Sequence, residues 1–161
     1  MRSFRSQIGI IPAVAALSLA ACGGSSAPSS SAPTASPSSA ALIHTGSVKV
    51  GANSQTVLKS DKGLTLYYFT PDTETTVACT GGCATTWPPL LASSGTPTSN
   101  PALPGNLTVL NGANGKQVLY NGHPLYTYSK DGDSADAYGQ GIGGKWFVAT
   151  PDLAATAKYN Y

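Results

Sequence analysis

The sequence predicts a small, mostly β fold: an antiparallel β domain built from two pseudo-symmetric repeats and preceded by a disordered tether. Three observations lead to this prediction. The segment at residues 63–72 recurs at residues 122–131 with the same spacing of aromatic and acidic side chains. Short segments rich in β-forming residues alternate with turns that contain Gly, Asn and Asp. Finally, no segment shows a sustained helical period with capping residues at its ends.

The repeat extends beyond those two segments. The offset of 59 residues that aligns them also aligns Trp87 with Trp146. Upstream, residues 51–53 match residues 112–114 at an offset of 61, so repeat two has lost two residues in the turn between. A half of about 60 residues buries too little surface to be stable alone, so we expect one shared core. The boundaries are residues 42–161 for the domain, about 47–95 for repeat one and about 106–152 for repeat two.

In repeat one, three short segments are rich in β-forming residues, and a turn at residues 61–63 joins the last two. A single helical turn is expected at residues 84–87, where Pro88 and Pro89 end it. The expected strands of repeat one lie at residues 48–50, 55–59 and 64–69.

In repeat two, Asn121 and Gly122 form a strong signal for a type I′ hairpin turn. Pro124 cannot donate to a ladder of hydrogen bonds, so we expect its strand to lie at the edge of a sheet. The expected strands of repeat two lie at residues 107–110, 117–120, 125–128 and 145–149.

The first 21 residues are predicted to be a lipoprotein signal peptide. Arg2 and Arg5 precede an apolar stretch at residues 8–19. The segment ends in Leu-Ala-Ala-Cys at residues 19–22, which resembles a bacterial lipobox. In such a motif the Cys22 thiol receives a diacylglyceryl group before cleavage. The chain is then anchored to the extracytoplasmic face of the cell membrane without spanning it.

The segment after Cys22 is predicted to be a disordered tether, which with that cysteine occupies residues 22–41. Its residues 23–41 contain only Gly, Ser, Ala, Pro and Thr. Such a composition buries too little apolar surface to offset the entropy lost on ordering. As a flexible coil, this segment spans about 25 Å.

Composition excludes one class of partner. Only 10% of the residues are charged, and the formal net charge is +2. Both arginines lie in the signal peptide, which leaves seven Lys against seven Asp and Glu in the mature chain. Because nucleic-acid-binding domains carry a strongly basic surface, we expect no nucleic-acid partner.

The paired aromatic and acidic residues, with the Cys79–Cys83 loop and the Trp-Pro-Pro-Leu segment after it, resemble the bacterial secreted-repeat lipoproteins. That family is known by a Tyr-x-(Phe/Trp/Tyr)-x-x-Asp motif and has no established activity. Some members carry a loose association with alkane use, which the resemblance leaves as a remote alternative. The motif positions in this chain are Tyr67, Phe69, Asp72 and Trp87 in repeat one, and Tyr126, Tyr128, Asp131 and Trp146 in repeat two.

The matched aromatic residues allow two interpretations. Core and half-buried surface is the favoured one, and an aromatic face that binds a ligand is the other. With few charges in the domain, any recognition surface is expected to be aromatic and polar.

Cys79 and Cys83 remain as a pair in an oxidising compartment once Cys22 is lipidated. Gly81 and Gly82 allow the backbone conformations that such a small ring needs. A structural disulfide is the favoured reading. A redox or electron-transfer role, or ligation of a metal, stays open as an alternative.

Asp131, Asp133 and Asp136 resemble the start of a calcium loop. An EF-hand requires Gly at position six and Glu at position twelve, where this chain has Asp136 and Ile142. A turn in which the Asp side chains cap their own backbone is therefore favoured over a weak Ca²⁺ site.

No catalytic constellation is evident. Neither His44 nor His123 has a nucleophile and an orienting carboxylate near it in the sequence. We therefore expect no enzyme activity and no cofactor. The sequence favours a membrane-anchored lipoprotein whose β domain has a non-catalytic binding or structural role in the cell envelope.

Overall fold

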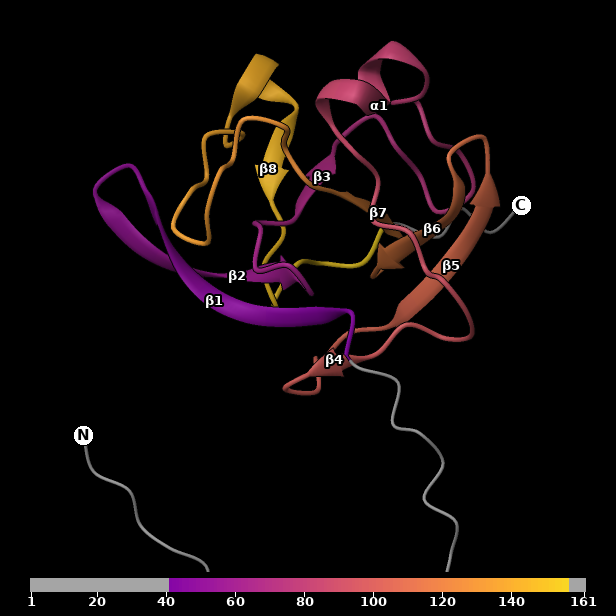
Figure 1. Cartoon of the computed structure of the whole chain (residues 1–161), viewed down its shortest axis with the longest axis horizontal. Coiled ribbons are helices and arrows are strands. Elements are labelled where there is room, and N and C mark those ends of the chain that lie inside the picture. Colours follow the sequence, from indigo (N-terminus) through magenta and orange to yellow (C-terminus); the bar gives the residue numbers. More distant parts are fainter. Residues whose placement is uncertain (1–40, 157–161) are drawn as a thin grey trace, which may run out of the picture. The chain divides into compact units, whose positions relative to one another are not determined.

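A computed structural model describes residues 41–156 of the chain (Figure 1). It confirms the mostly β fold. The strands form a three-stranded sheet in the order β2-β1-β4 and a five-stranded sheet in the order β5-β6-β7-β3-β8. The strands are β1 (Ile43–Val50), β2 (Asn53–Ser60), β3 (Tyr67–Phe69), β4 (Ser99–Asn100), β5 (Leu107–Gly112), β6 (Gly115–Tyr120), β7 (His123–Tyr126) and β8 (Trp146–Val148).

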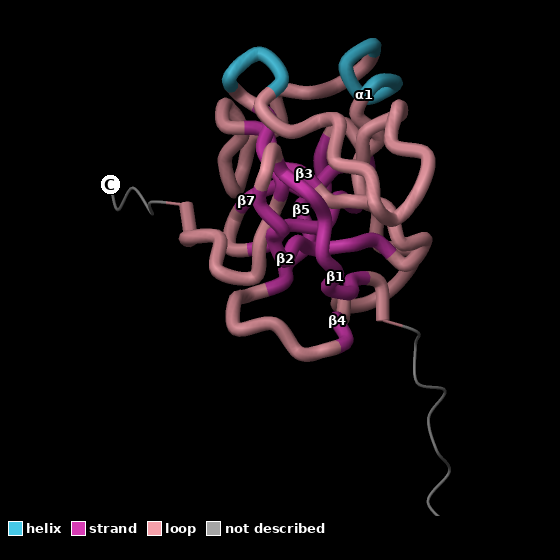
Figure 2. Tube along the Cα trace, turned by 90° about the vertical axis from the view of Figure 1, so that its left-hand side faces the viewer, coloured by secondary structure: helices cyan, strands magenta, loops and turns pink. Residues whose placement is uncertain are grey.

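Two short helices accompany the sheets. Helix α1 spans Gly82–Thr86, close to the helical turn expected before Pro88. A 3₁₀ helix, η1, spans Ile142–Gly144, and neither it nor strand β4 was expected from the sequence. Both helices lie at one end of the domain, and β4 lies at the opposite end, beside the first described residues (Figures 1 and 2). The predicted signal peptide, Cys22 and nearly all of the predicted tether lie outside the described residues.

The predicted type I′ hairpin is present between β6 and β7. Asn121 and Gly122 have φ angles of 51° and 84°, and Tyr120 pairs with His123 on either side of them. Both positive φ angles are those that this turn requires.

The expectation that Pro124 marks a sheet edge is wrong, because β7 lies in the middle of the five-stranded sheet. Pro124 pairs with Leu119 of β6, next to the pair that closes the hairpin. At this non-hydrogen-bonded position its nitrogen points away from β6. On the other side, the pairing with β3 begins only at Leu125. No ladder partner therefore needs the missing N–H.

Gly122 is expected to tolerate no side chain. A Cβ atom there would collide with the Thr156 hydroxyl, and φ is positive. Gly122→Ala should therefore lower the free energy of unfolding by about 2–4 kcal/mol in urea titrations, from backbone strain and overpacking together. Gly112→Ala is the matched control, because a Cβ there meets only ordinary contacts. Equal losses in the two variants would contradict this reading.

The last segment of each repeat forms hydrogen bonds with the strands of the other repeat. Strand β8 of repeat two pairs with β3 of repeat one, and Ala149 bonds the backbone of Leu58 and Leu66 (N–O 2.8 Å each). Conversely, Leu90 of repeat one bonds Leu125 and Val118 of repeat two (2.9 and 2.8 Å). Each repeat therefore completes the sheet of the other.

The core lies where the repeats meet, and it has two clusters of buried side chains. One is mainly aliphatic and includes Ile43, Leu58, Leu66, Val118 and Leu125. The other is mainly aromatic and contains Val48, Val57, Tyr67, Cys79, Trp87, Tyr126, Tyr128, Trp146 and Val148. Both clusters draw on both repeats, which confirms the expectation of one shared core.

Candidate functional site

The residues of the paired motif meet at the centre of the aromatic cluster, and their hydrogen bonds cross between repeats. The Tyr67 hydroxyl of repeat one donates to Asp131 Oδ2 of repeat two at 2.6 Å. The Tyr126 hydroxyl of repeat two donates to Asp72 Oδ2 of repeat one at 2.5 Å. All four side chains are buried. We call these two hydrogen bonds the crossed Tyr–Asp pairs.

The second oxygen of each carboxylate fixes the loop that follows it. Asp72 Oδ1 accepts from the backbone N–H of Ala78 at 2.7 Å. Asp131 Oδ1 accepts from the backbone N–H of Tyr138 at 3.0 Å. Each aspartate therefore ties the loop of its own repeat to a tyrosine of the other repeat.

Four aromatic rings form a continuous stack beside the crossed pairs. Trp87 and Trp146 lie face to face at the middle, with ring centroids 3.7 Å apart and planes inclined by 2°. Trp87 stacks on Tyr128, and Trp146 stacks on Phe69, each with centroids 4.3 Å apart. Equivalent residues of the two repeats thus occupy equivalent places on either side of the tryptophan pair.

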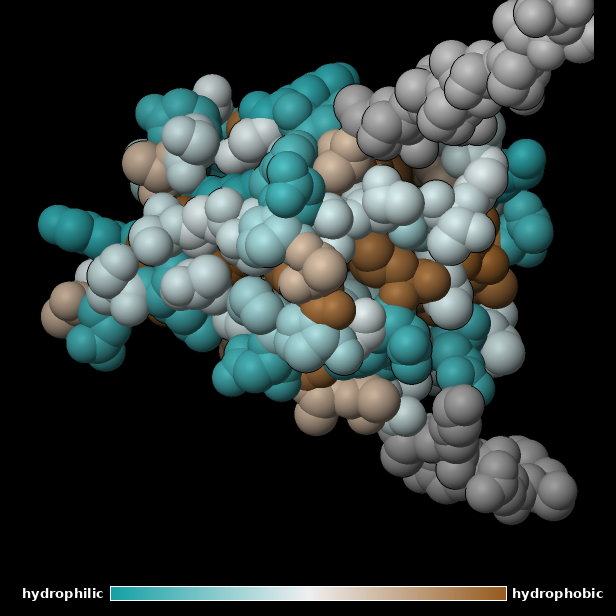
Figure 3. All heavy atoms as spheres, turned by 90° about the horizontal axis from the view of Figure 1, so that it is seen from below, coloured by the Kyte–Doolittle hydropathy of each residue, from teal (hydrophilic) through white to brown (hydrophobic). Residues whose placement is uncertain are grey.

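This burial agrees with the core interpretation of the matched aromatic residues and leaves them no ligand-binding face. Phe69 is half-buried, and the other five aromatic residues of the motif are buried. Among large apolar side chains, Leu91, Tyr138 and Ile142 are the exposed ones in the described part of the chain. Figure 3 shows a mostly polar face, with apolar side chains in small groups.

Burial also shifts the ionisation of the central groups. It raises the pKa values of Asp72 and Asp131 above the usual range, and hydrogen bonds from Tyr126 and Tyr67 partly oppose this. Burial, the hydrogen bond and the nearby carboxylate together raise the pKa values of both tyrosines well above 10. The phenols therefore stay protonated as donors.

His123 provides a pH test of the packing. Its Nε2 lies 3.0 Å from the Ala154 carbonyl oxygen, and its Nδ1 is buried without a hydrogen-bond partner. Burial lowers the pKa of His123 below 6.5, although the Ala154 carbonyl and the Asp72 charge oppose this shift. As pH falls through 6.5, the unfolded chain takes up a proton that the folded chain does not, so stability decreases.

His123→Gln should remove this loss and keep a donor for Ala154. Urea unfolding between pH 8 and pH 5 should therefore show a stability difference between wild type and variant that changes with pH. The raised pKa values of Asp72 and Asp131 act in the opposite direction, because protonation at lower pH favours the folded state. If the free energy of unfolding changed with pH in the same way in both proteins, His123 would not be the cause of the loss of stability at low pH.

Cys79 and Cys83 form a disulfide, with their Cα atoms 5.2 Å apart. Gly81 within the ring has a φ of 56°, whereas Gly82 needs no positive angle. Cys79 is fully buried in the aromatic cluster, and its carbonyl accepts from Asn114 Nδ2 at 2.9 Å. The pair closes the loop beside helix α1 and packs it against Trp87.

In the acidic loop, residues 131–136, the carboxylates of Asp133 and Asp136 accept hydrogen bonds from the backbone of the same loop. Asp133 Oδ1 accepts from the backbone N–H of Ala135 at 2.7 Å. Asp136 Oδ2 accepts from those of Gly132 and Asp133 at 2.7 and 3.2 Å. The capped turn expected from the sequence is therefore present. Within residues 41–156, no cluster of three His, Cys, Asp or Glu side chains is placed to hold a metal.

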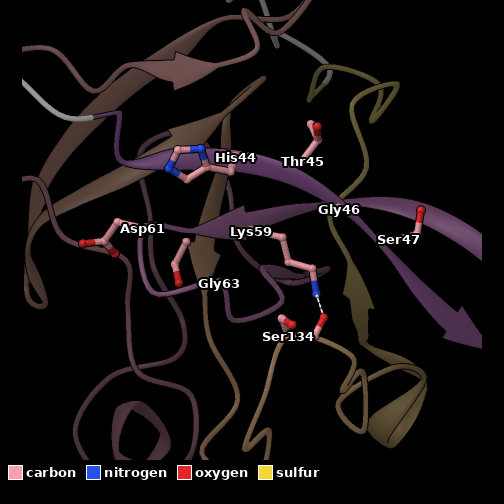
Figure 4. Close-up of a pocket in the computed structure, with 9 residues that line it drawn as sticks. His44, Thr45, Gly46, Ser47, Lys59, Asp61, Gly63 and Ser134 are labelled. Atoms are coloured by element: carbon pink, nitrogen blue, oxygen red, sulfur yellow. Dashed lines mark hydrogen bonds between the residues drawn. The ribbon is translucent and has the colours of Figure 1, made fainter.

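The structure adds a polar hollow that the sequence did not reveal (Figure 4). It has a volume of about 320 Å³ and lies against β1, the end of β2 and the acidic loop. His44 is half-buried, and its Nδ1 lies 3.1 Å from the Asn100 carbonyl oxygen. The lining residues are His44, Thr45, Gly46, Ser47, Lys59, Ser60, Asp61, Gly63 and Ser134.

Lys59 is the buried charged group at the wall of this polar hollow. It is 4% exposed, and its Nζ donates to Thr65 Oγ1 at 2.8 Å. The same Nζ donates to the Ser134 carbonyl oxygen at 2.8 Å (Figure 4). Burial lowers the pKa of Lys59, and the charges of Asp131, Asp133 and Asp136 oppose that shift. Strand alternation gave no signal for this buried lysine, because residues 57–60 are buried on both faces of β2.

A family model described as a secreted repeat of unknown function matches the chain twice, at residues 53–91 and 108–150. No curated protein and no solved structure matches significantly. No helix in the described part of the chain is long and apolar enough to cross a membrane.

Proposed function

Because the chain belongs to the family of secreted repeats of unknown function, and so is an exported protein, we propose that it is a lipid-anchored binding module of the cell envelope. Its domain stands on the extracytoplasmic face of the membrane and holds a small polar ligand without transforming it. The single observation that carries the binding role is the polar hollow beside Lys59.

The anchor in this proposal is the diacylglyceryl group on Cys22. The Leu-Ala-Ala-Cys segment supports it, as do the positive and apolar segments before it. The tether then supplies the distance from the membrane. The domain meets the tether at the β4 end, so the two helices lie at the end away from that attachment (Figures 1 and 2).

The paired Tyr-x-aromatic-x-x-Asp motif has a structural role in this proposal. Its tyrosines and aspartates form the crossed pairs, and its aromatic residues form the stack. With these side chains occupied in the core, ligand recognition falls to the polar surface. The polar side chains and backbone groups of the residues that line the hollow offer donors and acceptors to hydroxyl, amide or carbonyl groups of a ligand.

One experiment tests the anchor. Cells that express the wild-type chain or Cys22→Ser are labelled with a clickable fatty acid and then separated into membrane and soluble fractions. Wild-type protein should carry the label in the membrane fraction, and the variant should be unlabelled. Labelled Cys22→Ser protein would exclude Cys22 as the lipidation site.

A second experiment tests the binding role. Native mass spectrometry of the protein recovered from its own envelope should show a bound small molecule. Ser134→Trp, which fills the polar hollow from the loop that carries Asp133 and Asp136, should lose that molecule. Thr75→Trp, on an exposed loop elsewhere, is the matched control and should keep it. A protein that carries no ligand, or that turns over a substrate, would contradict a non-catalytic binding role.

A further inference from the structure

The aromatic stack has the geometry of an electron-transfer chain. Its four rings lie in the order Phe69, Trp146, Trp87, Tyr128, and neighbouring ring centroids are no more than 4.3 Å apart. Electrons pass most readily between rings in contact, and tryptophan and tyrosine are among the side chains that lose one electron most easily. The parallel tryptophan pair is the site in the stack that is most easily oxidised, because the positive charge is delocalised over two stacked rings.

A proton acceptor lies beside this stack. Tyr67 packs edge-on against Trp87, with centroids 5.5 Å apart, and its hydroxyl donates to Asp131 Oδ2. A phenol that loses an electron must also lose its proton, and a carboxylate within hydrogen-bond distance can take it. The equivalent residues of the opposite repeats have the same arrangement: Tyr126 packs edge-on against Trp146 and donates to Asp72.

A loop that reaches the surface packs against Tyr67 and Trp87. The backbone N–H of Gly139 donates to the Tyr67 hydroxyl at 3.3 Å. A Cβ on Gly139 would lie 2.8 Å from Tyr67 Cζ and Trp87 Cη2, so the backbone itself packs against both rings. The preceding residue, Tyr138, is 66% exposed. In repeat one the aligned residue is Cys79, which is buried in the disulfide.

We propose that the tryptophan pair and Tyr67 form a one-electron relay that moves an oxidising equivalent from Trp87 and Trp146 to Tyr138 at the surface. The oxidant is a radical species of the oxidising envelope that reaches the domain. The relay goes beyond the binding role proposed above and does not depend on it. It delivers the oxidising equivalent to an exposed phenol, where an external reductant can repair it, and so spares the buried core.

The oxidant takes one electron from Trp87 and is reduced. Tyr67 returns one electron to Trp87, and its hydroxyl proton moves to Asp131 Oδ2. Tyr138 then gives one electron to Tyr67, which recovers its proton from Asp131, while the Tyr138 hydroxyl proton goes to water. The net change is one electron and one proton lost from Tyr138.

Pulse radiolysis of the full chain with azide radical as the oxidant tests the relay. The tryptophan radical should decay as a tyrosyl radical grows, at a rate that does not depend on protein concentration. Peptide mapping should then place the dityrosine cross-link at Tyr138. A tryptophan radical that decays only by encounters between molecules, with no tyrosyl growth, would overturn the proposal.

Three variants separate the relay from direct oxidation at the surface. Trp87→Phe should lower the dityrosine yield at Tyr138 several-fold, and an unchanged yield would overturn the proposal. Asp131→Asn keeps an acceptor for Tyr67 but takes no proton, so the transfer should slow several-fold. Tyr138→Phe, at an exposed site, should abolish the surface product and lengthen the life of the buried radical.

Tyr68→Phe is the matched control. Tyr68 is half-buried and packs against His123 and Phe147 rather than against the stack. Its removal should leave both the rate and the yield unchanged. If Trp87→Phe does not fold, Tyr138→Phe decides: a buried radical whose life is the same in this variant and in wild type excludes transfer to Tyr138.

Discussion

Replacing Trp87 with alanine is expected to lower the free energy of unfolding by about 3–5 kcal/mol, the cost of removing a large aromatic side chain from a packed core. Trp87 is 5% exposed and contacts Trp146, Tyr128 and Tyr67. Since small domains have a total stability of about 5–15 kcal/mol, this loss is a large fraction of the whole. Urea titration followed by near-ultraviolet circular dichroism measures it.

The pseudo-symmetry makes this prediction stricter. Trp146→Ala removes the equivalent ring from the other repeat, so its loss should be of similar size. Tyr138→Ala, at an exposed position, should change stability by only about 0.5 kcal/mol. A large difference between the two tryptophan variants would show that one repeat holds the core without the other.

Cutting the chain between the repeats should leave the domain assembled. Residues 93–96 are exposed, so a protease site placed there can be cleaved in the folded protein. Because each repeat completes the sheet of the other, the two pieces should stay together on gel filtration. After separation in denaturant, neither piece alone should regain cooperative unfolding, and their mixture should recover the native signal.

The uncleaved protein with the same inserted site is the control for the insertion itself. If one piece folded alone, its sheet would not need the segment that the other piece supplies. That result would show that the repeats do not complete each other's sheets through β8 and the segment around Leu90. Pieces that separate after cleavage without denaturant would show the same.

Local signals in the sequence were enough to predict much of the fold. Asn121 and Gly122 predicted their hairpin because two consecutive positive φ angles are a property of that dipeptide. The offset of 59 residues predicted two equivalent halves with a shared core. The prediction for Pro124 was wrong because, in a hairpin, every second backbone nitrogen makes no hydrogen bond to the partner strand, even when the strand lies in the middle of a sheet. Which strand pairs on the other side depends on the whole fold and not on the local sequence.

The site was less accessible from the sequence. The motif residues were identified, but no local rule says that Tyr67 bonds the aspartate of the other repeat rather than Asp72 in its own. That choice depends on how the two halves pack. Lys59 was missed for the same reason, because its partners Thr65 and Ser134 come together only in the folded chain.

Double-mutant cycles on stability test most directly whether the hydrogen bonds of the motif cross between repeats. Tyr67→Phe combined with Asp131→Asn should show a coupling energy of about 0.5–3 kcal/mol, because these side chains share a hydrogen bond. Tyr67→Phe combined with Asp72→Asn should be additive to within about 0.5 kcal/mol, although both residues belong to repeat one. Coupling within a repeat that equals or exceeds coupling between repeats would contradict the interlocked structure.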